Sequence, residues 1–172
     1  MLLIGIDTGT NTGFAIWDAA EQRLIESGSE SIIKVMAYLA DLKTRHEIFV
    51  RIEDARLNKR PSDKTSRDRL RGFGSVSRDA AIWVEWCEFY KVPYLCSKAG
   101  VTFKGKDKAE QFQKITGIQK TNNHQRDAIF MVWNTTQAHL KQLIQIYEHE
   151  KTTATTKTTS NHVPKFPKKV LG

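Results

Sequence analysis

The sequence predicts an α/β protein in which one mixed sheet of five strands is flanked by helices. Short apolar runs bounded by turn residues, at residues 2–6 and 48–52, are typical of buried strands. Apolar residues recur at helical spacing over residues 31–45 and again over 75–90. A chain of 172 residues is long enough to bury a core without disulfides. We therefore expect one folded domain over residues 1–150.

Each predicted element follows from its local pattern. Three short strands joined by tight turns, at residues 2–6, 13–17 and 23–27, predict an antiparallel meander. The helix at 31–45 leads into the strand at 48–52, and a right-handed crossover makes this strand parallel to the first. The first part of residues 56–71 is predicted to be a loop, followed by a helix at 75–90 and an edge strand at 92–96. A helix at 104–116 is expected to end at Gly117, and a last helix to run from Asn122 or Asn123 toward Leu143.

The charge balance favours a polyanionic partner. Lysine and arginine number 27 against 19 acidic residues, a net charge of +8, which suits nucleic acid or an anionic membrane surface. No stretch approaches the roughly 20 apolar residues of a spanning helix, and no signal peptide opens the chain. We expect a cytoplasmic protein without a membrane partner. Cys87 and Cys96 have no zinc-type spacing and are expected to be reduced thiols.

Two basic segments stand out as candidate DNA contacts. The first spans residues 56–71 and has two acidic residues against seven basic ones, which are Arg56, Lys59, Arg60, Lys64, Arg67, Arg69 and Arg71. The second, Lys104, Lys106 and Lys108, precedes a predicted helix and could hold backbone phosphate, although a solvated face is also consistent. Residues 151–172 are rich in Thr, Lys and Pro without any acid, and we expect a disordered basic tail.

Acidic residues close two of the predicted strands. Asp7 follows residues 2–6 and precedes a loop of small residues, and Glu53 follows residues 48–52. Because parallel strands end at the same edge of a sheet, we expect the two carboxylates to be neighbours. Taken alone, Asp7 is also compatible with a residue that only starts a turn.

A third acid opens the last predicted helix. His124 lies three residues before Asp127, so the two side chains project from nearly the same face. In-line phosphodiester cleavage needs an activated water and stabilised oxygens, which two Mg²⁺ ions about 3.5 to 4 Å apart can supply. Such ions take carboxylate ligands, and Asp7, Glu53 and Asp127 are suitable. His124 could ligate a metal or act as an acid or base, but it is also compatible with a cap-region residue.

Three short motifs occur in this order: Ile4-Gly5-Ile6-Asp7 with Thr8-Gly9-Thr10 and Gly13, then Ile52-Glu53, then His124-Gln125-Arg126-Asp127-Ala128. Over roughly residues 1–135 the chain resembles the RuvC-type Holliday junction resolvases of the RNase H-like superfamily, its divergent phage and bacterial members above all. The resemblance implies an RNase H-like fold and a homodimer that cuts four-way DNA junctions. It also implies Asp7, Glu53, His124 and Asp127 as the catalytic and metal-binding set, with two Mg²⁺ ions or Mn²⁺ in their place.

The chain departs from this family in two respects. The Thr-rich basic tail has no counterpart in the family pattern, and Arg56 stands where resolvases often carry an aromatic residue that helps to open the junction. Phe73, just beyond the basic segment, could open the junction instead. Two other interpretations of the same chemistry stay open: a ribonuclease H that cleaves RNA-DNA hybrids, and a DNA-binding protein without catalysis. The first motif also resembles the phosphate loop of actin-like ATPases and sugar kinases, but no second phosphate loop follows.

Overall fold

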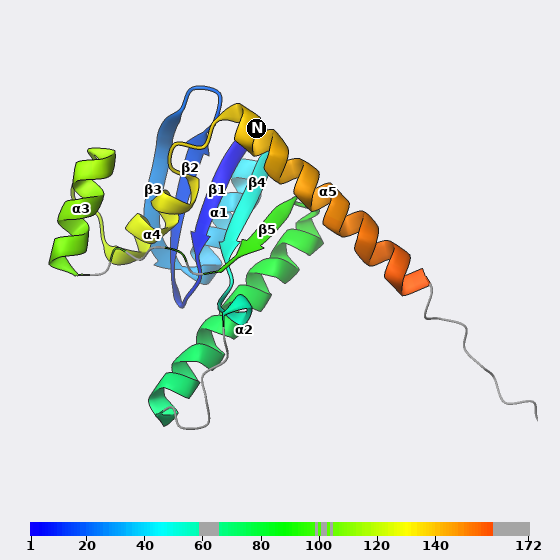
Figure 1. The fold of residues 1–172 in the computed structure, drawn as a ribbon, viewed down its shortest axis with the longest axis horizontal. Coiled ribbons are helices and arrows are strands. Elements are labelled where there is room, and N and C mark those ends of the chain that lie inside the picture. The colour runs from blue at the N-terminus through cyan, green and yellow to red at the C-terminus, as the bar shows by residue number, and fades with distance from the viewer. Residues whose placement is uncertain (59–65, 99, 101–102, 104, 160–172) are drawn as a thin grey trace, which may run out of the picture.

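A five-stranded mixed sheet forms the centre of the molecule (Figure 1). The structure is a computed structural model that describes residues 1–58, 66–98, 100, 103 and 105–159. In spatial order the strands are β3 (Arg23–Ser31), β2 (Asn11–Asp18), β1 (Leu2–Asp7), β4 (Ile48–Glu53) and β5 (Tyr94–Ser97). β1 and β2 pair antiparallel, as do β2 and β3, whereas β1–β4 and β4–β5 are parallel. The predicted meander, crossover and edge strand are confirmed.

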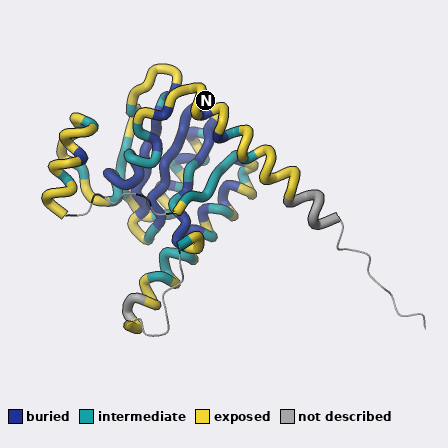
Figure 2. Tube along the Cα trace, in the orientation of Figure 1, coloured by how far each residue is buried: buried dark blue, intermediate teal, exposed yellow. Residues whose placement is uncertain are grey.

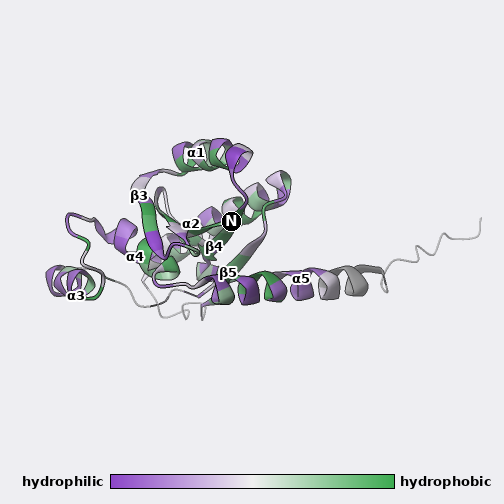
Figure 3. Cartoon of the chain, turned by 90° about the horizontal axis from the view of Figure 1, so that it is seen from above, coloured by the Kyte–Doolittle hydropathy of each residue, from purple (hydrophilic) through white to green (hydrophobic). Residues whose placement is uncertain are grey.

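Five α-helices and one short 3-10 helix occur in the described residues. They are α1 (Ile32–Arg45), η1 (Ala55–Leu57), α2 (Arg67–Tyr90), α3 (Lys106–Thr116), α4 (Asn123–Val132) and α5 (Gln137–Thr159). Seen along the sheet, α1 lies on one side and α4 and α5 lie on the other (Figure 3). Within these residues no helix is long and apolar enough to cross a membrane.

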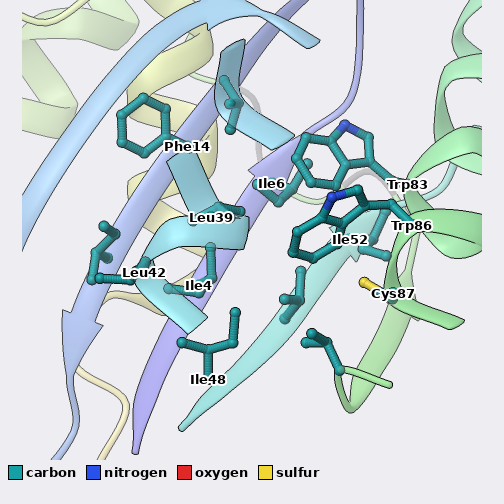
Figure 4. Close-up of a cluster of buried hydrophobic side chains, with 14 of the residues drawn as sticks. Ile4, Ile6, Phe14, Leu39, Leu42, Ile48, Ile52, Trp83, Trp86 and Cys87 are labelled. Atoms are coloured by element: carbon teal, nitrogen blue, oxygen red, sulfur yellow. The ribbon is translucent and has the colours of Figure 1, made fainter. Parts of the chain in front are cut away.

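Each face of the sheet packs in a hydrophobic cluster of its own. Alternate side chains of β1, such as Ile4 and Ile6, pack with Leu39 of α1 and Trp83 of α2 (Figure 4). The intervening side chains, which include Leu3, point to the other face and pack with α4 and the first turns of α5. Burial is deepest in β1, whereas α3 and the outer part of α5 are mostly exposed (Figure 2). Alternation along the central strands therefore assigns their side chains to one cluster or the other.

Three helix boundaries differ from the sequence prediction. α2 begins at Arg67, eight residues before the expected start. The expected last helix is two helices, because the chain turns between Val132 and Gln137, where Asn134 adopts a left-handed conformation with φ 57°. α5 then runs to Thr159, so the first residues of the predicted disordered tail are helical. Extending an existing helix costs little per residue. The remainder of that tail, residues 160–172, lies outside the described residues.

Candidate active site

Asp7 and Glu53 end two neighbouring parallel strands at one edge of the sheet. The register of β1 and β4 places Ile6 opposite Ile52, and the two acids are the next residues. The Thr8 hydroxyl links the strand ends by donating to the backbone oxygen of Glu53 at 2.9 Å. The expected neighbouring of these two positions is therefore confirmed.

Both acids belong to the face of the sheet that α4 covers. Leu3 and Phe49 pack in the cluster on this face, and Arg51 donates from its guanidinium to the backbone oxygen of Met131 in α4. Since alternate residues of a strand share a face, Asp7 lies on the side of Leu3, and Glu53 on the side of Phe49 and Arg51. The carboxyl edge of the sheet thus presents two acids toward one helix.

Two glycines let α4 approach the strands closely. A Cβ built on Gly5 would lie 2.4 Å from the backbone oxygen of Ala128, and one on Gly13 would lie 2.1 Å from the backbone oxygen of His124. Both distances are far below van der Waals contact, so these positions accept only a residue without a side chain. The helix backbone therefore rests almost directly on β1 and β2, and its first turn reaches the acidic edge.

His124 makes the most informative contact of the site. Its Nδ1 lies 2.7 Å from Oδ2 of Asp7, a residue 117 positions earlier in the chain. Asn122 starts the helix with a capping box that it shares with Gln125, which satisfies the first backbone N–H groups. Asp7 is only 7% exposed, whereas His124 keeps an open side. The imidazole and the carboxylate can therefore orient one another, and a solvent molecule or substrate can still reach the imidazole.

Asp127 lies one turn further along α4 and is 5% exposed. Its Oδ1 accepts a hydrogen bond from the backbone N–H of Phe103 at 2.7 Å. This N–H holds the carboxylate in one orientation. The structure therefore brings His124 into contact with Asp7 and places Asp127 on the same helix, with its carboxylate held by the connection between β5 and α3.

The donor set fits a hard divalent cation in kind. Three carboxylates and one imidazole, from Asp7, Glu53, Asp127 and His124, are groups that Mg²⁺ and Mn²⁺ accept. In the part of the chain that the structure describes, no three His, Cys, Asp or Glu side chains lie close enough together to hold a metal ion.

Asp54, the acid after Glu53, forms an ion pair with Arg56. It is 2% exposed, and both its oxygens accept hydrogen bonds from the Arg56 guanidinium, at 2.7 to 3.0 Å. Burial raises the pKa of the Asp54 carboxyl, but the hydrogen bonds from Arg56 outweigh burial and bring that pKa below its ordinary value. Arg56, a predicted DNA contact, thus holds the turn after β4 through this ion pair.

The other predicted DNA contacts are distributed over two helices. Arg67 and Arg71 are exposed on the first turns of α2, which projects beyond the edge of the sheet where β1 and β4 end (Figure 1). Phe73 is half-buried on the same helix, and Lys106 and Lys108 are exposed on the first turn of α3. The predicted contacts Lys59, Arg60, Lys64 and Lys104 lie outside the described residues, as does the side chain of Arg69.

Sequence reasoning missed two residues beside the site. Arg126 is 6% exposed, and its Nε donates to the backbone oxygen of Phe103 at 2.9 Å. Phe103 itself is 1% exposed and bonds to Asp127 through its N–H. Arg126 could have been recognised in the sequence, because it is a basic residue between His124 and Asp127. Phe103 could not, because its hydrogen-bond partners lie more than 20 residues away in the chain.

Compared with protein-family models and with curated proteins, the chain shows no match.

Proposed function

We propose that this chain is an RNase H-like, metal-dependent DNA endonuclease that resolves four-way junctions as a homodimer. The observation that carries the proposal is the contact between His124 and Asp7, at the edge where Glu53 ends the adjoining strand. When bound there, Mg²⁺ would supply an activated water and neutralise charge on the phosphate oxygens. Asp7, Glu53 and Asp127 would hold the metal, and His124 would hold or move a proton at Nδ1 or Nε2.

The basic helix starts give the proposed substrate a docking surface. Arg67 and Arg71 project beyond the acidic edge on α2, and Lys106 and Lys108 open α3. Positive side chains around an acidic, metal-binding edge attract a phosphate backbone and leave the chemistry to the acids. A four-way junction is cut symmetrically in two strands, which requires two copies of the site and favours a two-fold homodimer.

One feature favours the junction nuclease over a ribonuclease H. A ribonuclease H usually places its glutamate on the first helix, but the acid of α1 is Asp41, late in the helix. Asp41 is exposed and paired with Arg45, one turn away. In addition, α1 packs on the face of the sheet opposite to α4. The glutamate that ends β4 is thus the better partner for Asp7.

A substrate panel tests the proposal. The purified full chain is incubated in Mg²⁺ with labelled four-way, forked, linear duplex and RNA-DNA hybrid substrates, and the products are resolved on denaturing gels. We expect paired nicks in the four-way junction and little cleavage of the linear duplex. Preferential cutting of the hybrid would replace the proposal with a ribonuclease, and binding of junctions without any cleavage would replace it with a non-catalytic DNA-binding protein.

The salt dependence of binding tests the docking surface. Replacing Arg67 and Arg71 with Gln should lower the slope of log affinity against log salt by about one unit for each lost phosphate contact. The matched control replaces Lys43 and Arg45, which lie in the last turn of α1, and removes the same charge. A slope that falls equally in both variants would show that only net charge matters and that α2 does not track the DNA.

A further inference from the structure

In the described part of the connection between β5 and α3, Phe103 is hydrogen-bonded to α4. Both backbone polar groups of Phe103 are bound by consecutive residues of α4: its N–H donates to Asp127 Oδ1 at 2.7 Å, and its oxygen accepts from Arg126 Nε at 2.9 Å. The ring is 1% exposed and packs against Phe112 and Phe130, with centroids 5.3 and 4.7 Å away. Phe103 is therefore held through both its backbone and its side chain.

Arg126 is the rigid part of this arrangement. Besides Phe103, its guanidinium donates to the backbone oxygen of Thr121 and to Oδ1 of Asn123. Three acceptors at fixed positions leave this planar group a single orientation. With 6% exposure, Arg126 cannot serve as a phosphate contact on the surface. Its bonds to backbone oxygens fix the two ends of the connection around α3, at Phe103 and at Thr121.

We infer that Arg126 is a positioning residue for Asp127 and acts through the backbone of Phe103. The inference rests on the proposed function in that Asp127 is taken as a metal ligand. Because Arg126 fixes the oxygen of Phe103, it also fixes the residue whose N–H holds Asp127 Oδ1. Among the described residues Oδ2 of Asp127 receives no hydrogen bond, so this oxygen is left to coordinate a cation. Partners that orient a ligand in this way typically set metal affinity.

The contacts of Phe103 also position the first turn of α3, which carries basic residues. Gly105, two residues after Phe103, is the N-cap of α3 and has φ 88°. Lys106 and Lys108 occupy the first turn that follows. Phe103 therefore connects Asp127 with the basic first turn of α3, and a loosened Phe103 should disturb the positions of both.

Metal binding without DNA tests the inference. Binding of Mn²⁺ to the full chain is measured by isothermal titration calorimetry, and folding is checked by circular dichroism. Arg126→Ala should weaken Mn²⁺ binding by roughly 10- to 100-fold. Arg126→Lys should fall between this variant and the wild type, because an ammonium keeps the charge but not the three-way geometry. Arg45→Ala, on an exposed arginine at the end of α1, is the matched control and should leave the affinity unchanged.

A purely structural role predicts a different result. In that case Arg126→Ala would lower the melting temperature, but the folded variant would bind Mn²⁺ as the wild type does, and that outcome overturns the inference. If Arg126→Ala does not fold, wild-type Mn²⁺ affinity in the folded Arg126→Lys variant overturns it in the same way. Failure of a wild-type chain to bind Mn²⁺ also overturns it. Junction cleavage separates the two proposals: a wild type that binds Mn²⁺ through this arrangement but cuts no junction refutes the nuclease alone.

Discussion

The two faces of the sheet are built on opposite packing principles. Toward α1 and α2, strand residues such as Ile4 and Ile6 fill the gap with large side chains, and Trp83 is fully buried against them. Toward α4, other strand residues such as Leu3 and Phe49 also pack in a cluster, but Gly5 and Gly13 carry no side chain, and the helix backbone takes the space beside them. The first face holds the helices at side-chain distance, whereas the second face allows contact of backbone with backbone.

This difference explains why the candidate site lies on the α4 face. Short side chains such as His and Asp reach one another only where their backbones are close, and the glycine contacts bring His124 within 2.7 Å of Asp7. On the other face an equivalent pair would be separated by a layer of aliphatic and aromatic groups (Figure 4). Both faces bury a hydrophobic cluster, but the α4 face also carries the candidate site, and substitutions should separate these two contributions.

The largest loss of stability should come from a substitution on the face that packs against α1 and α2. Trp83→Ala removes a fully buried indole and should lower the free energy of unfolding by about 3–5 kcal/mol, measured by urea denaturation. Because Trp83 lies opposite the site, the variant should still bind Mn²⁺ under conditions where it is folded. A loss below about 1 kcal/mol would show that packing of Trp83 against α1 and the sheet contributes little to stability.

A smaller loss with a larger effect on the site is expected for Gly13→Ala. The new Cβ would collide with the backbone oxygen of His124, which should cost about 1–3 kcal/mol and move His124 away from Asp7. Gly74→Ala is the control, since a Cβ at this exposed position of α2 meets nothing within 4 Å and should stabilise the helix by about 0.5–1 kcal/mol. If the two variants had the same free energy of unfolding and the same cleavage rate, the close approach of α4 to the strands would have no effect on the site.

A third loss of stability, of similar size, is expected at the ion pair in the turn after β4. Asp54→Asn weakens the bonds to Arg56 and should lower stability at pH 7 by about 1.5–3 kcal/mol. Because the folded-state pKa of Asp54 is depressed, its contribution is present above the unfolded pKa of about 3.9 and is lost as pH falls through the folded value. The gap between wild type and variant should therefore narrow below about pH 4, and a gap independent of pH would refute this account.

Local sequence patterns account for the sheet and for the edge where its acids lie. Apolar runs identified β1 and β4, and the rule for parallel crossovers placed Asp7 beside Glu53. Asn122 was a recognisable cap, and its capping box confirms it. These features depend on neighbours in sequence or on general topology, which is why they could be read without coordinates.

Features set by distant contacts could not be predicted. The predicted loop rested on Pro61 and Ser62, and the apolar period that marks a helix was recognised only from Ser75 on, so the first turns of α2 were missed. The break between α4 and α5 has its cause in tertiary structure, where the Trp17 indole donates to the backbone oxygen of Thr135, 118 residues away. The bond from Phe103 to Asp127 is likewise non-local. Such contacts leave no periodic trace in the chain.

The most direct test of the account is a paired measurement on Asp7→Asn. This substitution keeps the size of the side chain but removes the negative charge at the centre of the site. We expect Mg²⁺-dependent cleavage of a four-way junction to be abolished while circular dichroism and junction affinity, measured by gel shift in EDTA, stay at wild-type values. Cleavage at the wild-type rate by a folded Asp7→Asn protein would contradict the account, because the carboxylate that His124 contacts would then have no part in the chemistry.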